Sequence, residues 1–346
     1  MKTRGYAARS PATPLTPFEF DRRPPGDRDV HVRIDFCGIC HSDIHVARNE
    51  WRRTTYPCVP GHEIVGRVVA TGRRVTEYAE GQRVAVGCMV DSCRQCANCQ
   101  AGHENYCEKR PTYTYNSLDL DGVSQTFGGY STQIVVDERF VLGLPDRLDP
   151  AASAPLLCAG VTTYAPMRAA GLTKGSRLAV VGLGGLGHMA VKLGVSFGAA
   201  VTVLSRSPGK EADARRLGAD DFVLTTRKGA LSGHAGRYDV VLDTVAAGHD
   251  LTPQLSLLQA RGTLILVGMP ASDHTFDALS LISGGRRILG SPIGSIAETR
   301  EVLDHCGRHG ITSDIELITP DRINEAFERT IAGDVKYRFV VDCSAF

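Results

Sequence analysis

Short apolar runs follow one another through the first 150 residues of the chain. They are separated by turns rich in glycine and proline, which favour changes of direction over continued helix. This spacing is typical of short strands in an all-β, barrel-like domain. The pattern predicts strands at residues 29–36, 63–70, 82–90 and 130–136.

A different pattern begins near residue 176, where apolar runs of strand length alternate with stretches of helical periodicity. Strands that alternate with helices predict a parallel, doubly wound sheet, and therefore an α/β domain of the Rossmann type. The predicted strands lie at residues 177–182, 200–205, 221–224, 238–243, 262–267 and 287–290. The clearest helices between them lie at residues 185–197 and 210–217.

The last part of the chain offers only small elements. They are a helix, a strand, a second helix and a last strand, at residues 295–309, 315–318, 322–332 and 337–342. These elements are too small to bury a core of their own, so we expect them to pack onto the first domain. The chain therefore predicts a β domain of residues 1–153 and 292–346, interrupted by an α/β domain of residues 154–291.

The composition of the 346 residues excludes several classes of protein. Hydrophobic residues make up 42% and charged residues 22%, which excludes a disordered chain. The 39 Lys and Arg residues nearly balance the 38 Asp and Glu residues, so neither nucleic acid nor a membrane is an expected partner. The first residues lead into no apolar signal segment, and no apolar run is long enough to span a bilayer. We expect a soluble, cytoplasmic protein.

The chain has 11 cysteines, an odd number that argues against a disulfide framework in a protein without a secretion signal. Four of them form the motif Cys93-x2-Cys96-x2-Cys99-x7-Cys107. Steps of three residues bring successive sulfurs to one side of a tight turn, and the longer step closes a tetrahedron. This predicts a structural zinc site. An iron–sulfur cluster and a nucleic-acid-binding zinc ribbon are the alternatives, and few basic residues flank the motif to support the ribbon.

A second set of possible metal ligands is scattered along the chain as Cys40, His62, Glu63 and Cys158. Each alone is more often a buried packing residue than a ligand. Their context favours a ligand role, because polar residues crowd around Cys40 directly after an apolar run, and Gly61-His62-Glu63 ends a proline-punctuated loop. Two thiolates and an imidazole leave the fourth position of a zinc tetrahedron free, which is typical of a catalytic zinc site.

A glycine motif follows the first predicted strand of the α/β domain, in Gly182-Leu183-Gly184-Gly185-Leu186-Gly187. Gly182 suits the tight turn, Gly184 the close approach of the backbone to a pyrophosphate, and Gly187 the close packing of helix on strand. Backbone N–H groups of the helix start, from Gly185 and Leu186 onward, would bind the phosphates. The motif predicts a dinucleotide site.

The end of the next strand indicates which dinucleotide binds. An NAD site needs an acidic residue about twenty residues beyond the glycines. This chain instead has Ser205, Arg206, Ser207 and Lys210 there, with no acidic residue before Glu211. Hydroxyl, guanidinium and ammonium groups suit a 2′-phosphate, so we predict NADP(H). The alternative interpretation is an ordinary exposed basic loop.

Taken together, these motifs resemble those of the zinc-dependent medium-chain alcohol dehydrogenases, and most closely the cinnamyl-alcohol-dehydrogenase-like branch with its NADP-linked aldehyde reductases. The resemblance covers nearly the whole chain. It lies in residues 40–45, 60–63, 87–93, 157–160, 182–188 and 334–339. It implies a GroES-like, all-β catalytic domain beside the Rossmann domain, and a dimer.

The resemblance also implies roles for individual residues. Cys40, His62 and Cys158 would bind a catalytic zinc ion that Glu63 can approach. Ser42 would pass the alcohol proton toward His45, and Asp43 would orient the ring of His62. Thr162 and Arg338 would contact the cofactor. The ligands of a second, structural zinc ion would be Cys93, Cys96, Cys99 and Cys107, and the packing thiols would be Cys37, Cys58, Cys88, Cys306 and Cys343.

The implied reaction is reversible hydride transfer between NADP(H) and a primary alcohol or aldehyde, aromatic or aliphatic. Trp51, Met269 and Ile293 are candidate substrate-lining residues, and the alternative for Trp51 is ordinary packing. Two further functions stay open: a polyol dehydrogenase or double-bond reductase on the same fold, and a non-enzymatic redox or metal-binding protein.

Overall fold

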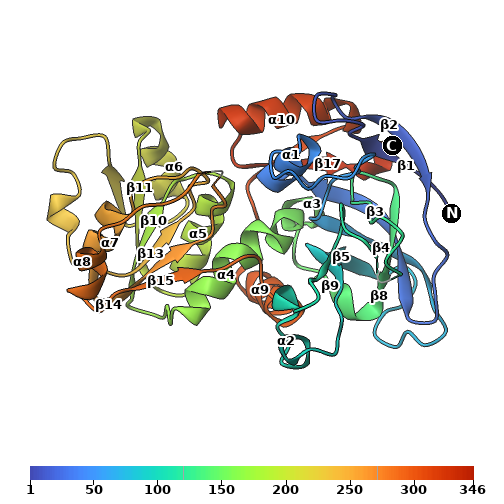
Figure 1. The fold of residues 1–346 in the computed structure, drawn as a ribbon, viewed down its shortest axis with the longest axis horizontal. Coiled ribbons are helices and arrows are strands. Elements are labelled where there is room, and N and C mark those ends of the chain that lie inside the picture. Colours follow the sequence, from blue (N-terminus) through green and yellow to red (C-terminus); the bar gives the residue numbers. More distant parts are fainter. Residues whose placement is uncertain (120, 271) are drawn as a thin grey trace. The chain divides into compact units, whose positions relative to one another are not determined.

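The computed structural model describes residues 1–119, 121–270 and 272–346. The chain forms two compact units (Figure 1). The first unit contains Met1–Val161 and Ile293–Phe346, and the second contains Thr162–Pro292. The observed division lies after Val161, inside helix α4 (Ala159–Ala169). The predicted division lay a few residues earlier, after residue 153.

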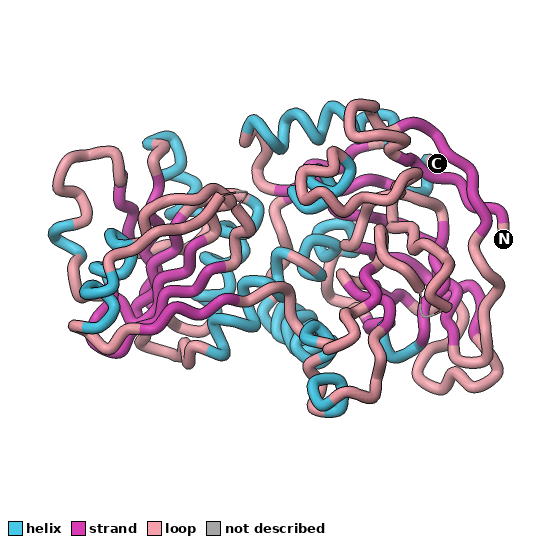
Figure 2. Tube along the Cα trace, viewed as in Figure 1, coloured by secondary structure: helices cyan, strands magenta, loops and turns pink. Residues whose placement is uncertain are grey.

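A sheet built around the long strand β3 is the core of the first unit (Figure 2). Its strand order is β16 (Ile315–Ile318), β17 (Arg338–Asp342), β3 (Asp29–Gly38), β4 (Ile64–Thr71), β5 (Arg83–Val86) and β9 (Val141–Gly143), with β8 (Gln133–Asp137) also paired to β3. Strand β3 pairs with β17, β4 and β8, in each case antiparallel. The last strand of the chain thus joins the sheet formed by its first 150 residues.

Smaller elements surround this sheet. The remaining strands pair in two-stranded ribbons, β1 (Lys2–Ala7) with β2 (Thr16–Asp21) and β6 (Met89–Asp91) with β7 (Thr112–Tyr113). The helices of this unit are α1 (His41–Ala47), α2 (Ala97–Gln100), α3 (Pro150–Ser153), α9 (Ile296–His309) and α10 (Ile323–Ala332). A capping box of Ser295 and Glu298 starts α9, and Gly310 ends it in the left-handed conformation.

Two predicted strands of the β domain differ from the observed ones. The prediction of one strand over 82–90 is wrong, because Gly87 and Cys88 separate β5 from β6, which lie in different sheets. The strand predicted at 130–136 starts later, at Gln133. Residues before it pair with the 59–61 loop instead, since Gly128 and Tyr130 donate to the carbonyls of Val59 and Pro60.

The second unit contains a parallel six-stranded sheet. Its order is β12 (Asp221–Leu224), β11 (Ala200–Ser205), β10 (Arg177–Val181), β13 (Tyr238–Asp243), β14 (Leu258–Leu266) and β15 (Arg287–Gly290). The order reverses between β10 and β13, and open α/β sheets bind ligands at the carboxyl ends of the strands at such a switch point. Its helices are α5 (Gly185–Ser196), α6 (Glu211–Arg216), α7 (Thr252–Leu257) and α8 (Ala278–Ile282). The predicted fold class is confirmed.

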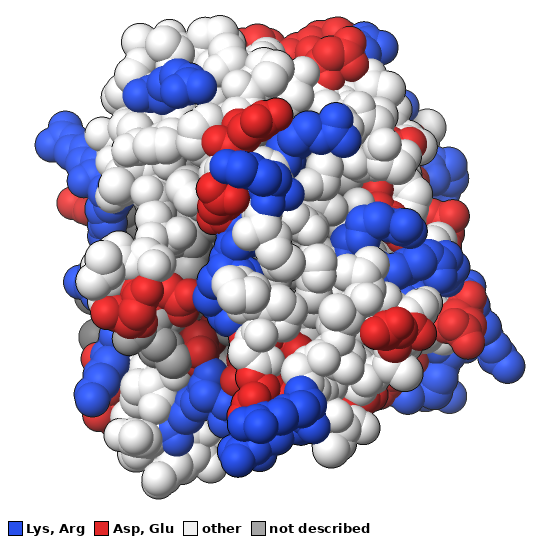
Figure 3. Space-filling model, turned by 90° about the vertical axis from the view of Figure 1, so that its right-hand side faces the viewer, with Lys and Arg blue, Asp and Glu red and all other residues white. Residues whose placement is uncertain are grey.

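The surface carries mixed charge. On the face drawn in Figure 3, basic and acidic side chains lie among one another rather than in one field. Exposed ion pairs also join side chains of opposite charge, as between Arg73 and Asp27 at 2.7 Å in the first unit. Among the described residues, no helix has the length and apolar character needed to cross a membrane.

Candidate active site

Cys40 lies at the turn between strand β3 and helix α1, and its side chain is buried. The Asp43 side chain fixes this turn, because its Oδ2 accepts the Cys40 N–H at 2.9 Å while the Asp43 N–H donates to the Cys40 carbonyl at 3.0 Å. The Asp43 carboxylate is the N3 side chain of a capping box at the start of α1, whose other member is the Cys40 side chain. The thiol is therefore held by a locally rigid turn.

His62 and Glu63 end the loop that enters strand β4, and both are buried. The His62 Nδ1 atom lies 3.0 Å from Asp43 Oδ1, and the Tyr115 ring stacks on the imidazole with centroids 5.8 Å apart. Strand β3 makes room for the Glu63 carboxylate at Gly38, where a Cβ would lie 2.0 Å from Glu63 Oε2. The loop thus directs Nε2 of His62 away from Asp43 and leaves it free for a metal.

Cys158 stands between a 3₁₀ turn (Ala154–Leu157) and helix α4, and it is also buried. Its Sγ lies 3.9 Å from Cys40 Sγ, although 118 positions separate the two residues. Ligand atoms of Cys40, His62, Glu63 and Cys158 all lie within 4.8 Å of one another. The structure therefore brings all four predicted residues together.

The donor set fits a zinc ion. Zn–S bonds of about 2.3 Å at tetrahedral angles require sulfurs about 3.8 Å apart, close to the 3.9 Å observed. One Glu63 oxygen contacts the Arg338 guanidinium, whereas Oε2 is buried without a hydrogen-bond partner among the described residues. An unpartnered carboxylate oxygen beside two thiols is what a cation would satisfy.

The charges around this cluster perturb each other. The hydrogen bond from the Cys158 thiol lowers the pKa of Cys40 well below its ordinary value, and Arg338 and His62 act in the same direction. Burial raises the pKa of Glu63 to about 7, which Arg338 opposes. Burial would lower the pKa of Arg338, but Glu63, Cys40 and Cys158 together outweigh burial and raise this pKa. A thiolate, the form that binds metal, is therefore favoured at Cys40.

Helix α1 carries the three predicted catalytic residues Ser42, Asp43 and His45. Ser42 and His45 are three residues apart and so share one helix face, and both are partly exposed. Nδ1 of His45 contacts the carboxylate of Glu50, and its ring lies 5.2 Å from that of Trp51. The sequence analysis missed the Glu50 contact, because an exposed acid five residues away carries no motif.

The four cysteines of the predicted structural site also converge, with all sulfurs within 4.8 Å of one another. Cys99 Sγ lies 3.9 Å from Cys93 Sγ and 3.4 Å from Cys96 Sγ, close to the edges of a zinc–thiolate tetrahedron. Backbone N–H groups of Cys93 and Cys96 point at the sulfurs of Cys107 and Cys93 at 3.4 Å. Such donors stabilise thiolates. The set fits a closed zinc site.

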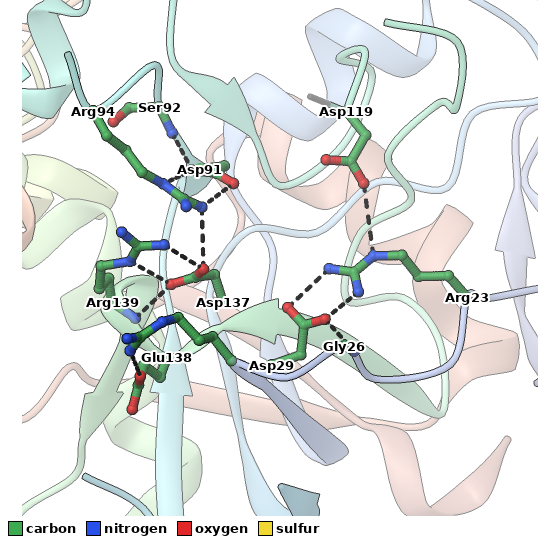
Figure 4. Close-up of polar contacts among 11 residues, drawn as sticks. Arg23, Gly26, Asp29, Asp91, Ser92, Arg94, Asp119, Asp137, Glu138 and Arg139 are labelled. Carbon is green, nitrogen blue, oxygen red and sulfur yellow. Dashed lines mark hydrogen bonds and ion pairs between the residues drawn. The ribbon is translucent and has the colours of Figure 1, made fainter. Parts of the chain in front are cut away.

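Arg94 attaches this cysteine lobe to the barrel (Figure 4). Its guanidinium donates to Asp91 Oδ1 at 2.8 Å and to Asp137 Oδ2 at 3.1 Å. Arg139 holds the other side of the Asp137 carboxylate, with Nε and Nη2 at 2.8 and 2.7 Å. Because Asp91 and Asp137 are both largely buried, they would repel each other without Arg94.

The glycine motif of the second unit adopts the geometry that a pyrophosphate site requires. Gly182 has φ +90° directly after β10, and Gly184 is the N-cap of α5. A Cβ at Gly187 would lie 2.1 Å from the Gly182 carbonyl oxygen, so only glycine fits there. Gly185 and Leu186 form the first turn of α5, where backbone N–H groups are free to bind phosphate.

The predicted 2′-phosphate residues follow strand β11. Ser205 is buried, and its Oγ accepts the Ser207 N–H at 3.2 Å. Arg206 and Ser207 are exposed. The Lys210 ammonium donates to the Leu183 carbonyl of the glycine motif at 2.8 Å. The strand end and the glycine motif are thus connected by a basic side chain.

The remaining predicted residues have separate environments. Thr162 Oγ1 and Arg338 Nε are buried and lack hydrogen-bond partners in the part of the chain that the structure describes. Trp51 packs with Val46, Cys58 and Tyr115, which agrees with a packing role. Met269 is exposed, and Ile293 is partly buried. Of the five predicted packing thiols, Cys37, Cys58, Cys306 and Cys343 are buried, whereas Cys88 is partly exposed and donates to the Leu157 carbonyl.

Two family models match the chain. Residues 26–146 match the alcohol dehydrogenase GroES-like domain, and residues 185–308 match the zinc-binding dehydrogenase domain. The chain is 50% identical over 344 residues to aldehyde reductase YahK of Escherichia coli K12, covering 99% of this chain and 98% of that protein. It is 51% identical over 340 residues to NADP-dependent alcohol dehydrogenase C of Mycobacterium bovis, covering 98% of each.

A solved structure of an alcohol dehydrogenase is also similar to this chain. A cinnamyl alcohol dehydrogenase from Sorghum bicolor is 46% identical, covers 99% of this chain and 98% of its own, and superposes with a TM-score of 0.97. The fold and the two sulfur-rich sites define an oxidoreductase of the zinc-binding class. The chain belongs to the zinc-dependent alcohol dehydrogenase family, in which its relatives include NADP-dependent alcohol dehydrogenases and cinnamyl alcohol dehydrogenases. The predicted resemblance is confirmed.

Proposed function

We propose that this protein transfers hydride reversibly between NADP(H) and a primary alcohol or aldehyde, with aldehyde reduction as the direction in the cell. The observation that carries the proposal is the buried set of Cys40, His62, Glu63 and Cys158, whose ligand atoms lie within 4.8 Å of one another. Two thiolates and one imidazole, from Cys40, Cys158 and His62, would leave a zinc ion able to accept a substrate oxygen, which is the arrangement of catalytic rather than structural zinc sites. A zinc ion bound there supplies a Lewis acid for the substrate oxygen.

The chain itself does the positioning. Cys40 and Cys158 bind as thiolates, and Asp43 accepts the Nδ1 proton of His62 and so presents Nε2 to the metal. Glu63 lies beside the ligands with one free oxygen, and Arg338 limits its movement. With a metal bound, the free Glu63 oxygen would be available as an additional ligand.

Two side chains of helix α1, Ser42 and His45, transfer the proton to or from the substrate. In alcohol oxidation, Ser42 Oγ accepts the alcohol proton and gives its own proton to His45. In aldehyde reduction, the same two residues supply the proton that balances the hydride. The contact with Glu50 fixes the His45 ring through Nδ1, which leaves Nε2 to exchange the proton.

The pyrophosphate and 2′-phosphate contacts are assigned to two loops of the second unit. The backbone of Gly182, Gly184, Gly185, Leu186 and Gly187 receives the pyrophosphate. We assign the 2′-phosphate to Ser205, Arg206, Ser207 and Lys210, whose ammonium keeps two N–H groups beyond the one bonded to Leu183. Thr162 and Arg338, each with an unpartnered buried polar atom among the described residues, are assigned further cofactor contacts.

We also propose that the protein is a cytoplasmic homodimer. The thiols of both metal sites must stay reduced, as they do in the cytosol. Strand β15 is an outer strand of the six-stranded sheet, and α8 in the same unit exposes Leu279 and Ile282. An open edge and exposed apolar side chains are features of a pairing surface.

A panel of aliphatic, aromatic and terpenoid aldehydes, each assayed with NADPH and with NADH, tests the proposed function. We expect several aldehydes to be reduced, with kcat/KM higher for NADPH. Turnover of polyols alone, reduction of carbon–carbon double bonds alone, or no turnover in a protein that holds both zinc ions would overturn the proposal.

A further inference from the structure

Tyr130 is a buried tyrosine whose hydroxyl group points at the metal-site network rather than at solvent. Its side chain has no exposed surface, and its hydroxyl donates to Asp43 Oδ2 at 2.9 Å. Asp43 lies 87 positions earlier in the chain and is not itself a metal ligand. The contact connects Tyr130 to the ligand shell through a single carboxylate.

That carboxylate carries a complete set of hydrogen bonds. Asp43 is fully buried, and in the described part of the chain each of its oxygens accepts two of them. Oδ1 accepts from Nδ1 of His62 at 3.0 Å and from the Gly61 N–H at 3.1 Å. Oδ2 accepts from the Cys40 N–H at 2.9 Å and from Tyr130 at 2.9 Å. Among these donors, Tyr130 alone belongs to no segment that carries a ligand.

The backbone holds Tyr130 in place without help from Asp43. Residues 128–130 run beside the loop before His62 and donate to the carbonyls of Val59, Gly61 and Pro60 at 2.8, 2.9 and 3.0 Å. The half-buried Arg22 guanidinium donates to the carbonyls of Phe127 and Gly128 in the same segment at 2.9 and 3.0 Å. The Tyr130 hydroxyl is therefore a fixed point against which Asp43 is oriented.

Close packing at Gly61 makes this arrangement possible. Gly61 has φ +104°, and a Cβ there would lie 2.8 Å from Cδ1 of the Tyr130 ring. The loop that presents His62 thus rests directly on the tyrosine ring. Burial, together with the Asp43 charge, raises the pKa of Tyr130 well above its ordinary value, so the hydroxyl keeps its proton and acts as the donor.

We infer that Tyr130 is a positioning residue for the catalytic metal: by donating to Asp43 Oδ2 it fixes the carboxylate plane, and Asp43 Oδ1 in turn fixes the imidazole of His62. The inference rests on the proposed metal site. Without the hydroxyl, Oδ2 loses one of its two closest donors in a buried place, and the Tyr115 hydroxyl is the other tyrosine facing this carboxylate. The carboxylate can then rotate away from His62. Partners that orient metal-binding histidines typically contribute tenfold to a hundredfold in metal affinity.

Tyr130→Phe tests the inference, because it removes the hydroxyl and keeps the ring that packs on Gly61. The matched control is Tyr238→Phe in the second unit, a buried tyrosine whose hydroxyl lies 2.8 Å from Nδ1 of His234. Zinc affinity is measured by chelator competition, which reports each of the two metal sites as a separate step. The visible spectrum of the Co²⁺-substituted protein reports ligand geometry at the catalytic site.

We expect Tyr130→Phe to lower the zinc affinity of the catalytic site by about tenfold or more and to leave the affinity of the structural site unchanged. The visible bands of the Co²⁺-substituted protein should shift. Tyr238→Phe should change neither metal readout. Unchanged affinity and an unchanged Co²⁺ spectrum in Tyr130→Phe would overturn the inference while the wild-type protein still held two zinc ions. A wild-type protein with one zinc ion would instead overturn the proposed function.

Discussion

Asp43 Oδ1 and His62 Nδ1 lie 3.0 Å apart in a region closed to solvent. The pair comes from helix α1 and from the loop before β4, so it connects the segment of one sulfur ligand to the imidazole ligand. A carboxylate in this position selects the histidine tautomer with a free Nε2. The tautomer needed for metal binding is thus determined by a residue that does not touch the metal.

Asp43→Asn tests this relationship. The amide keeps the size of the side chain but loses the charge and offers only one oxygen to the donors around it. We expect zinc at the catalytic site to bind about tenfold to a hundredfold more weakly, with kcat falling in parallel. Asp35→Asn on the partly exposed side of β3 is the matched control, and equal zinc affinity in both variants would contradict the role of Asp43.

Arg94→Met tests the attachment of the cysteine lobe. The substitution removes the cation between Asp91 and Asp137 and leaves Arg139 bound to Asp137 alone. We therefore expect a loss of about 1–3 kcal/mol in the free energy of unfolding and faster release of the structural zinc. Arg73→Met removes an exposed ion pair with Asp27 and should cost less than about 1 kcal/mol. Urea unfolding and zinc release kinetics measure both effects, and equal losses in the two variants would argue against the lobe contact.

Ser205→Asp tests the cofactor assignment. A carboxylate at the end of β11 would repel a 2′-phosphate and accept a hydrogen bond from a ribose hydroxyl. The KM for NADPH should therefore rise about tenfold or more, while the KM for NADH falls. Arg206→Ser should raise the KM for NADPH as well. Arg237→Ser, an exposed arginine at the opposite end of the sheet, serves as the control. An unchanged ratio of kcat/KM for the two cofactors in Ser205→Asp would remove the argument for NADP(H).

Cys58 should resist alkylation in the folded protein. It is fully buried, and burial raises its pKa to about 12, so at pH 8 the reactive thiolate is a very small fraction, on the order of one in ten thousand. The fraction grows as pH rises toward the pKa. Iodoacetamide labelling with mass spectrometry at pH 8 should modify the partly exposed Cys88 well before Cys58, and the reverse order would be inconsistent with the described burial.

The sequence predicted the ligands individually because each lies in a short motif with its own chemistry. Their convergence could be expected only from the family resemblance, since Cys40 and Cys158 are 118 positions apart and no local rule brings them within 3.9 Å. The hydrogen bond from Tyr130 to Asp43 was missed for the same reason. The neighbouring glycines were the available signal, because Gly128 permits the close approach to the 59–61 loop and Gly129 leaves room for Ile64 and Cys37.

Helices α1 and α4 were not predicted, and local propensity explains why. Helix α1 has seven residues and depends on the Asp43 capping interaction rather than on an apolar stripe. Helix α4 contains Gly160, β-branched residues and Pro166, all unfavourable inside a helix. Burial of Val161, Tyr164 and Met167 outweighs these preferences. The other strands of the parallel sheet were predicted closely, because apolar runs and strand propensity agree there, whereas the strand predicted at 262–267 is observed as β14 and already starts at Leu258.

Metal analysis of Cys158→Ala beside the wild-type protein tests the central claim most directly. The account predicts two tightly bound zinc ions per wild-type chain, and one in the variant, which keeps the ion of the cysteine lobe and loses aldehyde reduction. A variant that retains two zinc ions and normal turnover would contradict the assignment of Cys158 to the catalytic metal.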